Sequence, residues 1–206
     1  MKKHIVLAAC LAAGTVTGAM AQAAGEGPWL VRARAVHLDM ANKDGTGLGL
    51  SANNKTIGEL DVTYFFTPNF AAELMLTMPQ KQTVHSAVQD ADLGTFKHQP
   101  TTLMAQYHFT DLPGYKPYVG AGITYTHIKS VNLSSAVTEL NPLALDKHDS
   151  GGALQVGVDI PLDKNWSINF DIKKLFIRTR VYSDGTNVGT LKLDPLVAGV
   201  GVGYRF

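Results

Sequence analysis

The chain has 206 residues, of which 45% are hydrophobic and 17% charged, and its formal net charge is +1. With no polybasic block, this balance excludes a nucleic-acid-binding protein on electrostatic grounds. Soluble domains carry about 25% charged residues, so a soluble protein would have to explain the missing charge. Outside the first 24 residues, no uncharged apolar run approaches the length of a spanning helix, which needs about 20 residues. A helical membrane protein is therefore excluded.

Residues 1–23 have the organisation of a secretory signal peptide. Two lysines precede the uncharged stretch Ile5–Ala21, and small residues follow at the spacing of a cleavage site. Cleavage is expected after Ala21 or Ala23, and we favour Ala23. Residues 24–206 then form the exported domain.

The single cysteine, Cys10, lies in this leader, so the exported domain is expected to have no disulfide. The sequence Leu7–Cys10 resembles the cleavage box of a lipoprotein. Too few apolar residues precede it to form the apolar region of such a leader, so we favour a cleaved peptide over a lipid anchor.

In the exported domain, apolar residues recur at every second position, which is the pattern of β-strands. The segments are near the length that a tilted strand needs to cross a bilayer, about 9–11 residues. Eight segments show the pattern: Trp29–Leu38, Glu59–Phe66, Phe70–Met78, Leu103–Phe109, Tyr118–Tyr125, Leu154–Ile160, Trp166–Lys173 and Leu196–Phe206.

The connections alternate between short and long. Residues 67–69, 110–114 and 161–164 are tight and rich in turn residues. The polar connections 39–56, 79–98, 129–150 and 183–190 are longer. Short turns on one side and long loops on the other are typical of an outer-membrane barrel with both termini in the periplasm. We therefore expect an all-β fold, an eight-stranded antiparallel transmembrane β-barrel; a soluble β-sandwich is the alternative.

Charged residues are expected to face the lumen of this barrel. The first segment is ambiguous, because Arg32 and Arg34 share a face with Leu30 and Val36. Since arginines must face away from lipid, this face is expected to point inward. The predicted lumen ion network consists of Arg32, Arg34, Glu59, Asp61, Glu73, Asp159, Asp171, Lys173 and Arg205. Such a network is favoured as a structural plug, with an ion path as the alternative.

The alternation in the sequence indicates a shift by one position after Lys173-Lys174. A bulge there would turn Leu175 and Ile177 toward lipid and Phe176 inward, together with Arg178 and Arg180. Six aromatic residues near strand ends are expected to form girdles at the lipid interface: Tyr64, Tyr107, Tyr125, Trp166, Tyr204 and Phe206.

Other motifs favour structural roles. Asp39, Asn42 and Asp44 lack the ligand spacing and closing Glu of an EF-hand. The histidines of the exported domain never have zinc-ligand spacing. His127 and Ser130 would lie on opposite faces of a strand, which argues against a Ser–His hydrolase. No catalytic residue, metal or cofactor is expected.

Four stretches carry a family resemblance. The chain ends on Gly203-Tyr204-Arg205-Phe206 after alternating apolar residues, which resembles the signal that outer-membrane barrels present to their assembly machinery. The other stretches are Gln99–Phe109, Lys116–Tyr125 and Gln155–Asp159. In this order they resemble the outer membrane protein W family, which includes alkane-uptake proteins, over the whole exported domain. One departure is Gln99-Pro100-Thr101, where the family usually has an apolar residue followed by two prolines.

The resemblance implies a bacterial outer-membrane channel for passive uptake of small hydrophobic molecules, which leave sideways into the membrane. It implies the outer-membrane lipid, small apolar solutes and the barrel-assembly machinery as partners, the last through the terminal signal Val202, Tyr204 and Phe206. Apolar inward or rim positions toward the extracellular end form the candidate substrate path: Val36, Leu38, Ile57, Met75, Ile128 and Phe176. Simple packing of a narrow lumen, and a barrel that displays its loops to partners, are the alternatives.

Overall fold

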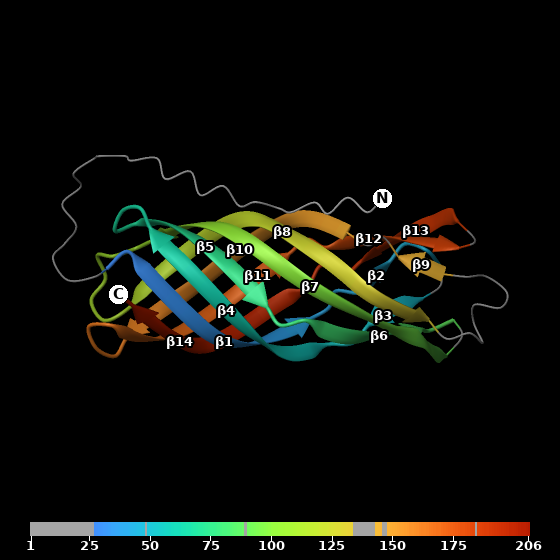
Figure 1. Ribbon diagram of the computed structural model, residues 1–206, viewed down its shortest axis with the longest axis horizontal. Helices are drawn as coiled ribbons and strands as arrows, with labels where there is room; N and C mark the ends of the chain where they lie inside the picture. Colours follow the sequence, from blue (N-terminus) through green and yellow to red (C-terminus); the bar gives the residue numbers. More distant parts are fainter. Residues whose placement is uncertain (1–26, 48, 89, 134–142, 146–147, 184) are drawn as a thin grey trace, which may run out of the picture.

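The computed structural model describes residues 27–206, except 48, 89, 134–142, 146–147 and 184. The regular elements of the described residues are β-strands (Figure 1). Their bounds are β1 Trp29–Asp39, β2 Lys43–Asp44, β3 Leu50–Ala52, β4 Lys55–Phe65, β5 Phe70–Thr77, β6 Gln80–Ser86, β7 Ala91–His108, β8 Lys116–Leu133, β9 Leu143–Leu145, β10 His148–Pro161, β11 Trp166–Leu175, β12 Arg178–Ser183, β13 Thr186–Lys192 and β14 Leu196–Arg205. Within this part of the chain, no helix has the length and apolar character needed to cross a membrane.

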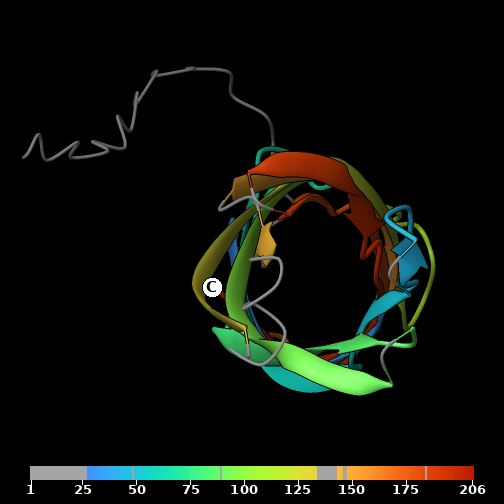
Figure 2. The same ribbon diagram turned by 90° about the vertical axis from the view of Figure 1, so that its right-hand side faces the viewer.

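Eight of these strands close into an antiparallel barrel, which confirms the predicted fold (Figure 2). The ring runs β1–β4–β5–β7–β8–β10–β11–β14 and returns to β1. The first and last strands pair from Leu30↔Arg205 to Asp39↔Leu196, and Trp29 and Phe206 exchange backbone hydrogen bonds of 3.1 and 2.9 Å. Closure gives each strand of the ring a paired neighbour on both sides, so the ring has no free edge strand, as a hydrocarbon environment demands.

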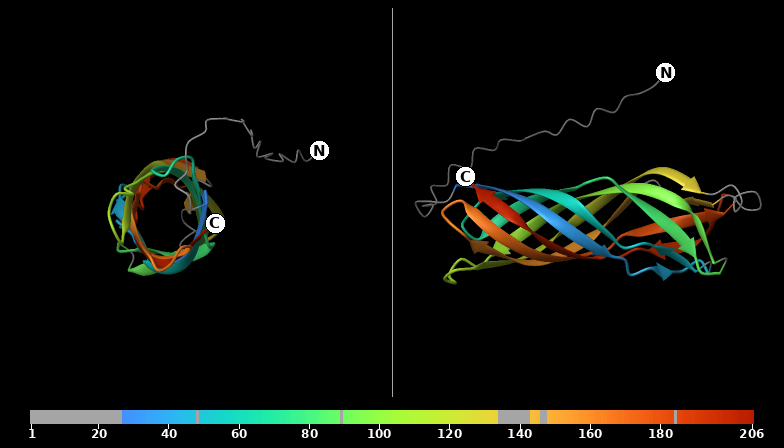
Figure 3. Two further views of the ribbon diagram at one scale, coloured as in Figure 1. Left: turned by 90° about the vertical axis from the view of Figure 1, so that its left-hand side faces the viewer. Right: turned by 90° about the horizontal axis from the view of Figure 1, so that it is seen from below.

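The two ends of the barrel differ (Figure 3). At the terminal end, where Trp29 and Phe206 lie, strands are joined by tight turns. At the opposite end, the loop end, β6 continues the wall beside the upper half of β7, and β12 and β13 pair as a hairpin with β2 and β9 on its edges. The connections predicted to be long are themselves partly regular. Residues 79–98 contain β6 and the upper half of β7, which extend the wall, and residues 183–190 contain part of the β12–β13 hairpin.

Side chains alternate between lumen and exterior as predicted for β1. Leu30, Arg32, Arg34 and Val36 are all at most 4% exposed, whereas the residues between them are more accessible. On the exterior, apolar residues such as Leu103, Val156 and Val200 remain about half exposed, as a lipid-facing surface requires.

Aromatic side chains form a belt at the terminal end. Cross-strand edge contacts join Trp29 to Tyr64 at 4.8 Å, Phe70 to Tyr107 at 5.0 Å and Trp166 to Tyr204 at 4.9 Å between ring centroids. Of the six residues predicted for the girdles, only Tyr125 lies toward the loop end. This belt marks the lower lipid interface of the barrel.

The predicted shift of register after Lys173 does not occur. Leu175, Ile177 and Val181 are at most 6% exposed and continue the inward face, whereas Phe176 is only half-buried. The chain stays extended where β11 ends, but changes partners: the Leu175 amide donates to Pro195 O, and the Phe176 amide donates to Gly152 O. Because no extra residue is inserted, odd-numbered residues continue to face inward after Lys173. The prediction that Phe176 faces the lumen was therefore wrong.

Candidate functional site

The lumen of the barrel is layered along its axis. From the terminal end upward, the layers are a small aromatic cluster, a charged network and an apolar compartment. Each layer is built by the inward positions of several strands, so residues distant in sequence meet across the lumen.

The lowest layer surrounds Phe65, which packs with Leu30 and Ala71. The Arg205 guanidinium lies 3.9 Å from the centre of the Phe65 ring and donates to Gly27 O at 2.8 Å. The His108 ring lies 4.7 Å from that of Phe65. This stack occupies the terminal end beneath the charged layer.

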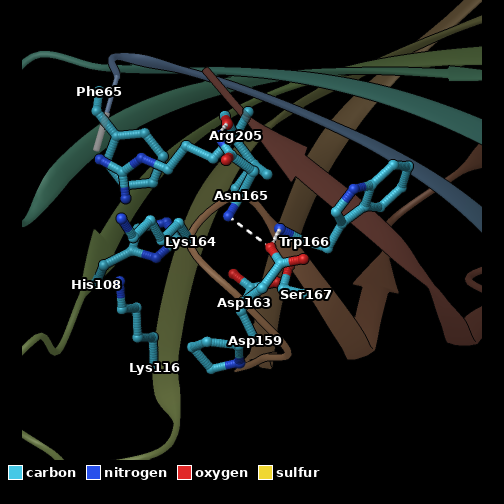
Figure 4. Close-up of a pocket in the computed structure, with 12 residues that line it drawn as sticks. Phe65, His108, Lys116, Asp159, Asp163, Lys164, Asn165, Trp166, Ser167 and Arg205 are labelled. Atoms are coloured by element: carbon cyan, nitrogen blue, oxygen red, sulfur yellow. Dashed lines mark hydrogen bonds between the residues drawn. The ribbon is translucent and has the colours of Figure 1, made fainter. Parts of the chain in front are cut away.

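A pocket of about 40 Å³ opens beside this stack (Figure 4). Asp163, in the β10–β11 turn, accepts hydrogen bonds from the backbone amides of Trp166 at 2.7 Å and Asn165 at 2.8 Å. These two bonds hold the pKa of Asp163 below its usual value. The carboxylate is thus committed to shaping the turn.

The middle layer is centred on Arg32, which is fully buried. Its guanidinium binds both oxygens of Asp159, at 3.1 and 2.6 Å, and Glu73 Oε1 at 2.7 Å. A bidentate pair, in which one guanidinium donates two parallel hydrogen bonds to one carboxylate, is among the strongest Arg–carboxylate interactions.

Arg34 and Lys173 extend the network across the lumen. Arg34 lies 3.1 Å from Glu73 and 3.2 Å from Asp61, while Lys173 contacts Glu59 and lies 3.0 Å from Asp171. The side chains in these ion pairs are at most 7% exposed. A desolvated network of this kind is stable only because its members are mutually paired.

The structure brings together eight of the nine residues predicted for the network, and it places Arg205 in the layer below. Sequence reasoning missed the neutral partners of the carboxylates. Gln155 donates to Glu73 at 3.0 Å and to Asp171 at 2.7 Å, and Asn169 donates to Asp159 at 2.8 Å. Both residues occupy inward positions in the alternating pattern, and this feature of the sequence could have identified them as partners of the carboxylates.

The network leaves no room beside Gly157. A Cβ added there would lie 2.4 Å from Tyr118 Cζ and 2.9 Å from Phe170 O. Because Tyr118 is fully buried, Gly157→Ala is expected to lower the free energy of unfolding by about 1–3 kcal/mol, the usual cost of overpacking. Urea unfolding of the barrel refolded in lipid measures this. Gly152→Ala is the matched control, since its Cβ would meet only Phe176 Cδ2 at 3.5 Å. Equal stability of both variants would contradict the prediction.

The upper layer is mainly apolar. Val36, Leu38, Met75 and Ile128 are buried to 5% exposure or less, and Ile57 packs against them. Five of the six residues predicted for the substrate path therefore lie together in this compartment, and Phe176 lies outside it. The compartment also contains residues that were not predicted, from the strands at the loop end and the segments beside them: Leu50, Ala52, Val84, Leu93, Phe96, Ile177, Val181, Leu191 and Leu193.

The wall beside this compartment has an interrupted hydrogen-bond ladder. β7 pairs with β5 up to Thr101↔Leu76, and with β6 from His98↔Gln80 onward. Pro100 lies between these pairs, and its carbonyl accepts from Thr77 Oγ1 at 2.7 Å, so this edge of Pro100 faces β5. Since N and O of one strand residue point to the same side, the amide hydrogen that proline lacks is missing from this edge.

A second interruption lies between β4 and β6. The β4–β5 register ends at Glu59↔Thr77, and no strand pairing joins β4 to β6 in the described part of the chain. Side chains bridge the gap: Lys55 Nζ donates to Lys81 O at 2.7 Å, and the Thr83 amide donates to Asn53 Oδ1 at 2.8 Å. β6 is thus paired with β7 along its length, but its lower half is joined to β4 only through side chains.

At the loop end, the structure supports turn formation rather than calcium binding by Asp44. Partial burial by itself would raise the pKa of Asp44. Hydrogen bonds from Thr46, Leu50 and Gly49 outweigh this effect and lower the pKa. The register also places His127 opposite His148, with their Nδ1 atoms 3.1 Å apart, a pair that sequence spacing did not reveal. The described residues contain no group of three or more His, Cys, Asp or Glu side chains that could hold a metal.

Comparison with known proteins identifies the chain's relatives. The family model for the OmpW family matches residues 25–206. Outer membrane protein W of Escherichia coli is 34% identical over 215 residues and covers 100% of both chains. Dibenzothiophene metabolism operon protein PahQ of Pseudomonas aeruginosa is 26% identical over 88% of this chain and 90% of its own. The crystal structure of OprG from Pseudomonas aeruginosa has the same fold, with a TM-score of 0.75, 24% identity and coverage of 88% and 97%. The chain therefore belongs to the OmpW family and is an outer-membrane β-barrel.

Proposed function

We propose that this barrel admits small hydrophobic molecules passively across the outer membrane and releases them sideways into the membrane. The observation that carries the proposal is the layering of the lumen. An apolar compartment at the loop end stands directly above a paired, desolvated charge network. An apolar solute gains by leaving water for such a compartment, but it cannot cross buried charges cheaply.

A solute stopped by the network needs another exit. The interruption at Pro100, between β5 and β6, and the unpaired gap between β4 and β6 offer the wall segment that opens at least cost in backbone hydrogen bonds. The relative PahQ, named for an operon of dibenzothiophene metabolism, supports an apolar solute.

The uptake proposal is tested by a charge in the upper compartment. Met75→Glu would place a carboxylate beside Asp61, which is opposite Met75 in the β4–β5 register. We expect it to reduce uptake of an apolar solute such as toluene at least several-fold, because the new charge holds water that the solute must displace. Phe176→Glu is the control at a position outside the lumen. Uptake is compared in cells that carry equal amounts of folded barrel, and unchanged uptake in Met75→Glu would refute the route.

Lateral release is tested by locking the gap between β4 and β6. Asn53 reaches the Thr83 backbone across this gap, so a disulfide between Asn53→Cys and Thr83→Cys should tie the two edges together. Uptake is expected to fall on oxidation and to recover on reduction, while each single-cysteine variant remains unaffected. A locked barrel with full uptake would show that the solute leaves by another path.

We infer that the N-terminal segment directs export and that the C-terminal strand carries the signal for assembly into the membrane. Residues 1–23 are proposed to be removed as a signal peptide. Val202, Tyr204 and Phe206 project from the outer face of the closing strand, with exposures of 47%, 39% and 55%. This row is accessible to an assembly machinery, and its position at the seam supports a role as the recognition signal.

A second candidate function, display of the loop end to envelope partners, draws support from the β12–β13 hairpin. This hairpin and its edge strands β2 and β9 form a separate small sheet above the barrel. Removal of Asn187 and its neighbours in β13, with uptake unchanged and binding to a surface lost, would favour display.

A further inference from the structure

The upper compartment contains a polar row on one side. Gln80 of β6 lies opposite His98 of β7, which lies opposite Ile128 of β8. Gln80 is 3% exposed and His98 2%, so both side chains are buried in the lumen. Gln82 and Thr126, also buried, lie on the same side of the compartment, on β6 and β8.

Six polar atoms of this row have no hydrogen-bond partner among the described residues, whereas Gln82 Nε2 donates to Asn53 O at 3.3 Å. These atoms are both ring nitrogens of His98, both amide atoms of Gln80, Oε1 of Gln82 and Oγ1 of Thr126. Leaving a buried donor or acceptor unpaired is costly, about 1–3 kcal/mol for each group. The amides of the charged layer, such as Gln155, are by contrast well bonded. The row therefore holds unused hydrogen-bonding capacity.

Much of the remaining lining around the row is apolar. The Phe96 ring lies 5.5 Å from the His98 ring, and Val36, Leu38 and Val197 belong to the same compartment from β1 and β14. The upper lumen thus combines an apolar lining with a donor-and-acceptor row on the β6–β8 side. A neutral imidazole and a primary amide each offer both a donor and an acceptor.

We propose that the upper lumen selects solutes with an apolar body and one uncharged hydrogen-bonding group, such as a phenol, an alcohol or a nitrogen heteroaromatic, over plain hydrocarbons. This inference rests on the proposed uptake function and specifies its substrate class. The body lies against the apolar lining, and the hydroxyl or ring nitrogen pairs with His98 and Gln80. A charged solute is excluded, because no described side chain of the row carries an opposite charge.

The test compares two solutes of similar shape, p-cresol and toluene. Uptake of each is measured in cells with wild-type barrel, Gln80→Leu, His98→Phe and the double variant. Gln99→Leu, at a half-buried position adjacent to His98 that points to the outside, is the matched control. We expect the double variant to lower the p-cresol to toluene ratio by about tenfold, the equivalent of one net hydrogen bond. The wild-type ratio should persist in Gln99→Leu.

Folding should not obscure the result. Replacing buried unpaired polar groups with apolar ones is near neutral or stabilising, so these variants are expected to fold at least as well as wild type. An equal ratio in wild type and the double variant would overturn the selectivity while leaving uptake standing.

A second measurement separates the inference from the uptake proposal. The side-chain ¹⁵N resonances of His98, in barrel refolded in lipid nanodiscs, should shift on addition of p-cresol and not of toluene. A shift without uptake of either solute would refute uptake but keep the binding site. Uptake without any p-cresol shift would overturn the site.

Discussion

Replacing Arg32 with methionine is expected to lower the free energy of unfolding of the barrel by about 3–5 kcal/mol, the usual cost of removing one member of a buried ion pair. Arg32 is fully buried and binds Asp159 in bidentate fashion and Glu73 at 2.7 Å. Methionine fills much of the volume but leaves two carboxylates in the lumen without this cation. The loss is therefore electrostatic rather than steric.

Urea unfolding of protein refolded in lipid vesicles measures the effect. Lys192→Met, the same change of charge at an exposed position of β13, is the control and should stay within about 0.5 kcal/mol of wild type. Adding Asp159→Asn to Arg32→Met should recover part of the loss, because it removes one stranded charge. A single variant as stable as the control would show that the network is not desolvated.

Placing arginine at Val158 is expected to cost about 2–4 kcal/mol, as it does near the midplane of other outer-membrane barrels. Val158 occupies an outward position of β10 between Val156, 52% exposed, and Ile160, 38% exposed. Both neighbours of Val158 on this face are apolar, so the guanidinium would have to reach a distant interface.

The same unfolding assay tests this substitution. Leu162→Arg, in the turn that follows β10, is the matched control and should cost only about 0–1 kcal/mol because interfaces tolerate charge. If Val158→Arg is no worse than Leu162→Arg, the assignment of the lipid face on β10 is incorrect.

Some features could be predicted from the sequence because the membrane allows only one arrangement of charged side chains. Lipid excludes Arg32 and Arg34, so the ambiguous first strand had only one possible orientation, and the structure has it. Phe176 was misassigned because two adjacent lysines suggested a shift of face. In the structure Lys174 simply lies outside, where its ammonium donates to Asp194 O.

Other features depend on register, which alternation does not determine. The opposition of His127 and His148, and of Gln80 and His98, follows from which residues pair across strands. The strands that extend the wall, such as β6, carry mixed polar sequence, and tertiary pairing rather than pattern decides their structure.

The charged layer also constrains how the barrel can be built. Arg32 enters on the first strand, yet its partner Asp159 is 127 residues further along the chain, and Lys173 follows its partner Glu59 by 114 residues. Until the late strands β10 and β11 arrive, Arg32 has Glu73 but lacks Asp159, and Glu59 lacks Lys173, so water must satisfy the remaining hydrogen-bonding groups of the charged layer. Strands cannot therefore enter the bilayer one hairpin at a time with a dry interior. We therefore expect the lumen to stay hydrated during insertion until the late strands bring the remaining partners of the charged layer.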